Sequence, residues 1–128
     1  FGEFYVEKDL LYVINELASA ISVLKYNRDT KTFVSIQQIS TLPAEYENIC
    51  ADLHITPDKR FLYASNRGHD SITCYRILED GCLKWESNVP CGGRTPRNFA
   101  IAESGGWLLA GNQDTDEIVI FQMEPGIL

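Results

Sequence analysis

Three stretches of this chain repeat one pattern, at intervals of about 50 residues. Each contains an alternating segment, a polar turn, a short apolar run and an asparagine near its end. The three are residues 4–16 (FYVEKDLLYVINE), 51–67 (ADLHITPDKRFLYASNR) and 97–113 (RNFAIAESGGWLLAGNQ). The second and third align without a gap, and the first has one residue fewer in its turn. A repeat of this length indicates stacked copies of one supersecondary unit.

Each unit is predicted to form antiparallel strands. In the second unit, Leu53 and Ile55 alternate with polar residues, as expected of a strand with two different faces. Pro57 and Asp58 favour a tight turn. The unbroken apolar run 61–64 predicts a following strand that is covered on both faces.

Further alternating segments complete the units. Third strands are expected at residues 20–26, 71–78 and 117–122, and fourth strands near residues 32–39 and 83–90. Four strands per repeat of this length are typical of a β-propeller blade. The predicted fold is therefore all-β, a β-propeller fragment of about three four-stranded antiparallel blades at approximately 1–41, 49–91 and 95–128. The third unit ends before its fourth strand.

A propeller of three blades has too few blades to close, because closure usually takes about four to eight. Blades at the two ends of such a segment expose faces that neighbouring blades would otherwise cover. We therefore expect self-association through the exposed blade faces. Little or no catalytic activity is expected from the 128 residues alone.

Composition excludes several classes of partner. The formal charge of −7 argues against a nucleic acid or an anionic membrane, and no apolar run approaches the roughly 18 residues that span a bilayer. The four cysteines, Cys50, Cys74, Cys82 and Cys91, form no Cys-x-x-Cys pair, so neither a metal site nor a cofactor is predicted. Reduced thiols and a cytoplasmic location are the simplest interpretation, although Cys50 and Cys91 precede equivalent strands and could be neighbours.

Three segments resemble a known family. YVINEL (12–17), ADLHITPDKRFLYASNRGHDSI (51–72) and GGRTPRNFAIAESGGWLLAGNQDTDEIVIF (92–121) are similar to the seven-bladed lactonase propellers. That family includes propeller-type 6-phosphogluconolactonases, and carboxy-cis,cis-muconate cyclase is a relative. The resemblance covers essentially the whole chain and corresponds to the last three blades or so. It implies that residues 1–128 are part of a larger lactonase-type propeller whose first four blades are absent here.

Candidate site residues lie at equivalent blade ends. In a propeller, the end of each second strand and the start of each innermost strand share one rim of the central channel. Two acids, two arginines and two amides occupy those positions: Glu16, Arg67 and Gln113 end second strands, and Asp52, Arg97 and Asn98 begin innermost strands. We expect these six side chains around one mouth. Asn15, Asn66 and Asn112 precede the first three, and their repetition indicates turn residues rather than catalytic ones.

Roles follow from chemistry and from the resemblance. Glu16, Arg67 and Gln113 differ while their neighbours stay constant, so the blade itself does not require them. The resemblance implies that Glu16 and Arg67 lie in the active-site region. We assign Glu16 as general base and Arg67 as the anchor for a phosphate or carboxylate, a task that suits a forked guanidinium. Either residue could instead be a solvated rim charge.

Two of the remaining candidates, Arg97 and His54, keep two interpretations each. Arg97 is a second anchor or a cap on the blade junction. His54 is catalytic, activating water, or is hydrogen-bonded between blades. Asp52, Asn98 and Gln113 are candidate substrate-binding residues.

Two classes of function remain open. One is an enzyme: the resemblance implies the C-terminal part of a 6-phosphogluconolactonase-like hydrolase, acting on 6-phospho-glucono-1,5-lactone in the pentose phosphate pathway, or of a muconate-cyclase-like lactone-forming isomerase. The other is a non-catalytic propeller segment that binds or self-assembles. The expected partner is a phosphorylated sugar lactone or a similar small anionic lactone.

Overall fold

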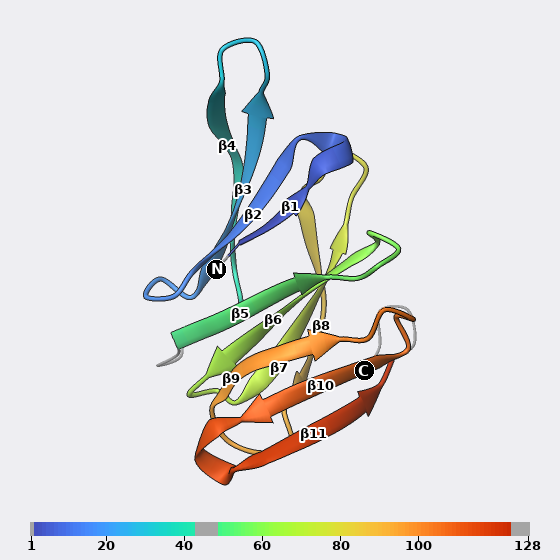
Figure 1. The fold of residues 1–128 in the computed structure, drawn as a ribbon. Coiled ribbons are helices and arrows are strands. Elements are labelled where there is room, and N and C mark those ends of the chain that lie inside the picture. The colour runs from blue at the N-terminus through green and yellow to red at the C-terminus, as the bar shows by residue number, and fades with distance from the viewer. Residues whose placement is uncertain (1, 43–48, 124–128) are drawn as a thin grey trace.

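The computed structural model describes residues 2–42 and 49–123 and confirms the predicted all-β fold (Figure 1). Its strands form three antiparallel sheets in which consecutive strands pair with each other. The helical elements of these described ranges are two three-residue 3₁₀ turns, η1 (Val6–Lys8) and η2 (Gln113–Thr115). Neither is long and apolar enough to cross a membrane.

We call the three sheets blades 1, 2 and 3. Blade 1 contains β1 (Gly2–Tyr5), β2 (Leu10–Asn15), β3 (Ala20–Asn27) and β4 (Thr32–Ser40). Blade 2 contains β5 (Ile49–Ile55), β6 (Phe61–Arg67), β7 (Ser71–Ile77) and β8 (Leu83–Pro90). Blade 3 contains β9 (Pro96–Ile101), β10 (Trp107–Asn112) and β11 (Glu117–Gln122). The end of the third predicted unit, 124–128, and part of the connection between the first two, 43–48, lie outside the described residues.

The same turn joins the second and third strands of every blade. The asparagine at or next to the end of the second strand pairs with the first residue of the third: Asn15 with Ala20, Asn66 with Ser71, and Asn112 with Glu117. The residue before each third strand has a left-handed backbone: Ser19 (φ 50°), Asp70 (φ 57°) and Asp116 (φ 51°). The sequence repeat is therefore a repeat of backbone conformation, and it places these three turns on one rim. We call this the site rim.

Blade 2 is covered on both faces, as the apolar run 61–64 predicts. Leu62 and Ala64 pack into the core between blades 1 and 2, while Phe61 and Tyr63 pack into the core between blades 2 and 3. These four side chains are at most 3% exposed. Because successive side chains of a strand point to opposite faces, an unbroken apolar run serves two cores at once.

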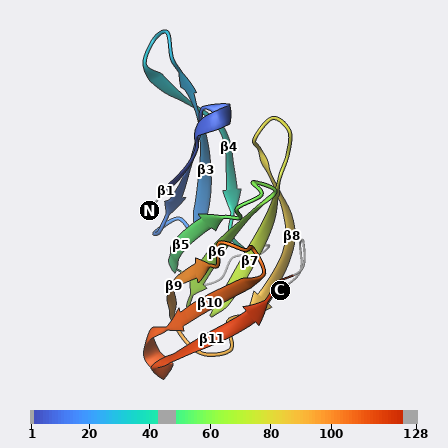
Figure 2. The same cartoon turned by 45° about the vertical axis from the view of Figure 1, so that its right-hand side comes forward.

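The innermost strands of the three blades lie side by side. β5 contacts β1 on one side and β9 on the other, and both views show this arrangement (Figures 1 and 2). Residues on these strands therefore meet across blade boundaries.

Hydrogen bonds hold blade 1 against blade 2. The buried Tyr12 hydroxyl donates to the Gly81 carbonyl at 2.6 Å. The Gln37 amide donates to the Leu83 carbonyl at 2.9 Å and accepts from the Leu83 N–H at 2.6 Å. Since buried polar groups cost free energy when unpaired, these bonds favour one relative placement of the two blades. That placement sets the separation of site residues contributed by different blades.

Candidate functional site

A pocket opens at the site rim where the three blades meet. Its volume is about 120 Å³, and it is lined by Glu16, Ala51, Arg67, Arg97 and Asn98. Glu16 follows β2 of blade 1, Ala51 and Arg67 belong to blade 2, and Arg97 and Asn98 belong to β9 of blade 3. Four of the seven predicted site residues thus meet in one hollow. We call it the rim pocket.

Glu16 and Arg67 form an ion pair across the boundary of blades 1 and 2. Arg67 Nη2 donates to Glu16 Oε1, and Arg67 Nε donates to the Ile49 carbonyl at 3.4 Å. The Arg67 side chain is 20% exposed and the Glu16 side chain 58% exposed. The arginine is therefore the fixed partner, while the carboxylate remains open to solvent and to a ligand.

A buried cysteine holds the Glu16 segment against β5. Cys50 Sγ lies 3.0 Å from the Asn15 carbonyl and 3.8 Å from the Glu16 carbonyl. Burial raises the pKa of this thiol to about 11, so it stays protonated and can donate at neutral pH. All four cysteines are free thiols; Cys50 lies in the first core and Cys91 in the second, so they are not neighbours.

Arg97 reaches the pocket from the start of β9. The preceding Thr95 has a left-handed backbone (φ 60°), and its N–H donates to Asp70 Oδ1 at 2.9 Å. This bond ties the start of β9 to the site-rim turn of blade 2. Among the described residues, no side chain or carbonyl pairs with the Arg97 guanidinium, which is exposed. Arg97 is thus available for an anion, in contrast to Arg67.

Asp52 and His54 lie behind the rim pocket and do not line it. His54 Nε2 is 3.0 Å from Asp52 Oδ2, and His54 Nδ1 is 3.0 Å from Glu3 Oε1 of blade 1. The hydrogen bond to Asp52 is the main cause that raises the pKa of His54 above its usual value, and Glu3 adds to it. Asp52 is buried at 6% exposure. This geometry matches the interpretation of His54 as a histidine bonded between blades.

Gln113 is on the site rim but outside the pocket. It begins η2, is exposed, and its N–H donates to the Thr95 carbonyl at 2.9 Å. The sequence predicts Gln113 at the end of the second strand, whereas β10 ends at Asn112 and Gln113 begins the 3₁₀ turn. No structural observation gives its side chain a role at the pocket, and substrate binding by Gln113 remains a prediction.

Two residues at or beside this site were missed from the sequence. Ala51 lines the pocket with a methyl group, which carries no chemical signal. Glu3 binds His54 but lies ahead of the repeated segment, so alignment of the units does not mark it. No group of three or more His, Cys, Asp or Glu is placed to hold a metal ion within residues 2–42 and 49–123.

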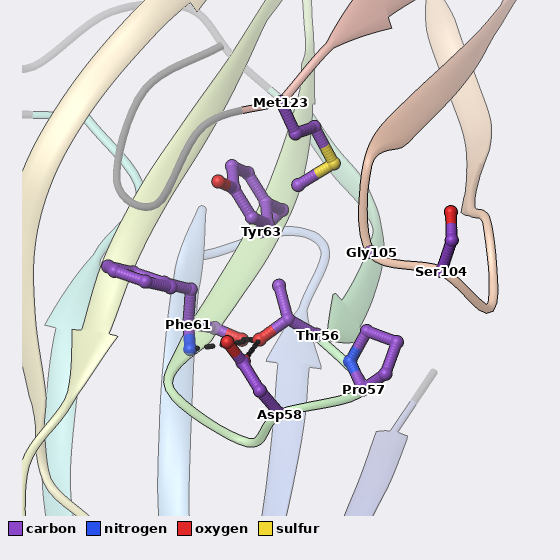
Figure 3. A pocket seen from close by; sticks show the side chains of 8 residues that line it. All are labelled: Thr56, Pro57, Asp58, Phe61, Tyr63, Ser104, Gly105 and Met123. Atoms are coloured by element: carbon purple, nitrogen blue, oxygen red, sulfur yellow. Dashed lines mark hydrogen bonds between the residues drawn. The ribbon is translucent and has the colours of Figure 1, made fainter.

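A larger pocket, of about 290 Å³, lies by the turns that join β5 to β6 and β9 to β10, at the other end of these strands from the site rim. Figure 3 shows the side chains that line it. It is lined by Thr56, Pro57, Asp58, Phe61, Tyr63, Ser104, Gly105 and Met123. Its polar groups serve the turn itself: the Thr56 hydroxyl donates to Asp58 Oδ1 at 2.6 Å and accepts from the Phe61 N–H at 3.1 Å. None of the described residues that line it is cationic. This cavity is larger than the rim pocket, but chemistry suited to an anionic lactone favours the rim pocket.

The chain matches the family described as Lactonase, 7-bladed beta-propeller, over residues 2–126. It belongs to this family. The 6-phosphogluconolactonase of Bacillus subtilis is 32% identical over 124 residues, covering 94% of this chain and 36% of that protein. A 6-phosphogluconolactonase of Formosa agariphila is 42% identical over 117 residues, covering 88% of this chain and 33% of that protein. The chain thus spans about a third of the length of the curated relatives it matches.

Solved structures agree with this assignment. A putative 6-phosphogluconolactonase from Bacteroides fragilis superposes with a TM-score of 0.89 at 27% identity, over 99% of this chain and 35% of that chain. A Lactobacillus plantarum protein gives 0.92 at 28% identity, over 97% and 37%. A periplasmic gluconolactonase from Pseudomonas aeruginosa gives 0.90 at 24% identity, over 100% and 36%, and shows the shared fold.

Proposed function

We propose that this chain supplies the anion-binding and water-activating part of a lactone hydrolase of the 6-phosphogluconolactonase type. One observation carries the proposal: a carboxylate and two guanidinium groups, contributed by three blades, line one pocket at the site rim. Membership of the lactonase family supports it, as do relatives named 6-phosphogluconolactonase at 32% and 42% identity. The proposed substrate is 6-phospho-glucono-1,5-lactone.

Hydrolysis of a lactone needs a base, an electrophilic group and an anchor. Glu16 accepts a proton from water as the water oxygen attacks the lactone carbonyl carbon. Arg67 contacts Glu16 and the Ile49 carbonyl, and in this proposal it donates toward the oxygen on which negative charge develops, in place of the phosphate-anchor role expected from the sequence. The ring C–O bond then breaks, and its oxygen takes up a proton to give the open acid.

Arg97 and Asn98 serve as the anchor. The Arg97 guanidinium has no protein partner in the described part of the chain, so binding a phosphate breaks no existing ion pair. Forked N–H donors match the geometry of phosphate oxygens. Asn98 adds an exposed amide next to it on β9.

The size of the pocket bears on the activity of this chain by itself. Ligand sites commonly measure about 300–1,000 Å³, whereas the rim pocket measures about 120 Å³. It can therefore enclose only part of a phosphorylated sugar lactone. We propose that efficient turnover needs further walls, and that the described residues on their own bind more readily than they catalyse.

Hydrolase is favoured over lactone-forming isomerase by the names of the relatives, which are 6-phosphogluconolactonases. Placement in the pentose phosphate pathway follows from that substrate and is part of the proposal. A cytoplasmic location is proposed from the four free thiols.

The test measures opening of 6-phospho-glucono-1,5-lactone by the protein at its natural full length, corrected for spontaneous hydrolysis. Glu16→Gln keeps the shape of the side chain and removes the base, so kcat should fall by roughly 10²–10⁴-fold. Arg28→Gln is the matched control, because Arg28 pairs with Asp9 away from the site rim. Wild-type turnover that Glu16→Gln leaves unchanged would remove Glu16 from the mechanism.

A further inference from the structure

A series of hydrogen bonds crosses all three innermost strands directly behind the rim pocket. Glu3 on β1 lies 3.0 Å from His54 Nδ1, and His54 Nε2 on β5 lies 3.0 Å from Asp52 Oδ2. The same Asp52 oxygen accepts the Phe99 N–H of β9 at 3.4 Å. One imidazole and one buried carboxylate therefore connect blade 1 to blade 3 through blade 2.

The Asp52 carboxylate links two walls of the pocket from behind. Asp52 directly follows Ala51, and Phe99 directly follows Asn98, both of which line the pocket. A β-bulge between Cys50 and Leu53 inserts an extra residue at this point of β5. Bulges re-aim side chains next to sites. This carboxylate therefore couples the blade 2 wall to the blade 3 wall through the Phe99 N–H.

The partners of His54 decide its protonation state in this arrangement. Both ring nitrogens face carboxylate oxygens, which only accept hydrogen bonds, so both must carry a proton for both bonds to form. Within the part of the chain that the structure describes, the charged groups that face the ring are Glu3 from β1 and Asp52 from β5. β9 presents the Phe99 ring edge-on at 4.9 Å, and the paired residue on β6 is the buried Tyr63. The hydrogen bond to Asp52, together with Glu3, outweighs the opposing effect of burial and raises the pKa of His54.

This state leaves His54 without a lone pair for catalysis. An imidazolium donating from both nitrogens cannot take a proton from water. Its charge is instead used to hold Asp52, whose second oxygen accepts the Leu53 N–H at 3.0 Å. The carboxylate is thereby fixed on both oxygens, with Phe99 of the neighbouring blade as one of its donors.

We propose that protonated His54 is a positioning residue: held between Glu3 and Asp52, it keeps the Asp52 carboxylate on the Phe99 N–H and so sets the separation of Arg67 and Arg97 across the rim pocket. The identity of the ligand rests on the proposed function, whereas the coupling between blades does not. Below the folded pKa of His54 the link is complete. As the pH rises through that pKa, one ring nitrogen loses its proton and one of the two carboxylate contacts becomes unfavourable.

The first test follows backbone amide resonances of the chain between pH 6 and pH 9. The Phe99 and Asn98 amides should shift with the same midpoint as the His54 ring, above the usual histidine value. In His54→Gln this pH dependence should disappear, and in Arg28→Gln it should persist. The other histidine of the chain, His69, lies in the turn after β6 and contacts Ser71. Its ring signals in the same spectra serve as the comparison for those of His54. If the Phe99 and Asn98 amide shifts do not follow the titration midpoint of His54, the proposal is overturned. This comparison needs only the wild type, so it holds even if His54→Gln fails to fold.

The second test measures binding of 6-phosphogluconate over the same pH range. Wild-type affinity should fall by about fivefold as His54 loses its proton, and His54→Gln should bind with the lower affinity at every pH above 7. Above pH 7 the phosphate of the probe is almost fully ionised. Any change in affinity that still comes from the probe should appear equally in the wild type and in His54→Gln. Affinity that falls equally in both proteins would overturn the positioning role. Absence of 6-phosphogluconate binding at any pH, together with the coupled amide shifts, would instead remove the proposed function and leave the link between blades intact.

Discussion

Substitution of Arg97 separates the two roles that this residue could have. Its guanidinium lines the rim pocket and has no partner among the described residues, whereas Arg67 is already paired with Glu16. If Arg97 is an anchor, Arg97→Gln should weaken phosphate binding and leave folding unchanged. If it caps the junction of blades 2 and 3, the same change should destabilise the protein.

The magnitude follows from one charge-assisted hydrogen-bonding contact. Hydrogen bonds to charged groups contribute about 1.5–3 kcal/mol, which corresponds to roughly 10- to 150-fold in affinity. Arg97 is exposed, so solvent weakens the contact and the lower end applies. We therefore expect Arg97→Gln to raise the Kd of 6-phosphogluconate by about tenfold.

Calorimetric titration with 6-phosphogluconate and with gluconate provides the assay, because the two probes differ only in the phosphate. Arg97→Gln should leave the gluconate Kd unchanged. Arg67→Gln should weaken both probes, since it also releases Glu16 from its ion pair. Equal losses for both probes in Arg97→Gln, or a clear drop in its Tm, would refute the anchor role and support the junction role.

Three further predictions concern stability and assembly. Leu62→Ala should lower the free energy of unfolding by roughly 2–5 kcal/mol in urea titrations, because Leu62 is 0% exposed between blades 1 and 2, whereas Leu17→Ala, at a residue 89% exposed, should have no measurable effect. Since the pKa of His54 is raised by folding, the stability it contributes is fully present below about pH 6.5 and is lost as the pH rises through the folded pKa. In thermal unfolding, the difference in Tm between wild type and His54→Gln should therefore be smaller at pH 9 than at pH 6. A difference in Tm that does not change with pH would contradict this. β11 forms the edge of its sheet within the described residues and exposes Ile118 (69%) and Ile120 (61%), so the chain should self-associate at high concentration in sedimentation experiments; Ile118→Lys should reduce this, and unchanged association would place the contact elsewhere.

The local sequence determined the blade and its register. Alternation in residues 53–55, the turn at Pro57 and the apolar run 61–64 specify which residues pair, because a slip of one residue would turn every side chain to the other face, whereas the bulge between Cys50 and Leu53 has no such signal. The repeated asparagines, Asn15, Asn66 and Asn112, mark the end of each blade that forms the site rim. Hence Glu16, Arg67, Arg97 and Asn98 could all be predicted at one end of the blades from the repeat alone.

Contacts between blades were decided only by the tertiary structure. Strand register specifies where a residue lies along its blade. It does not specify which side chain of the next blade that residue contacts, because this depends on how the two blades pack against each other. Glu3 therefore reaches His54 from blade 1, and Asp52 reaches the Phe99 N–H in blade 3, although no local pattern pairs them. For the same reason Arg67 is held by Glu16, while Arg97 has no protein partner in the described residues.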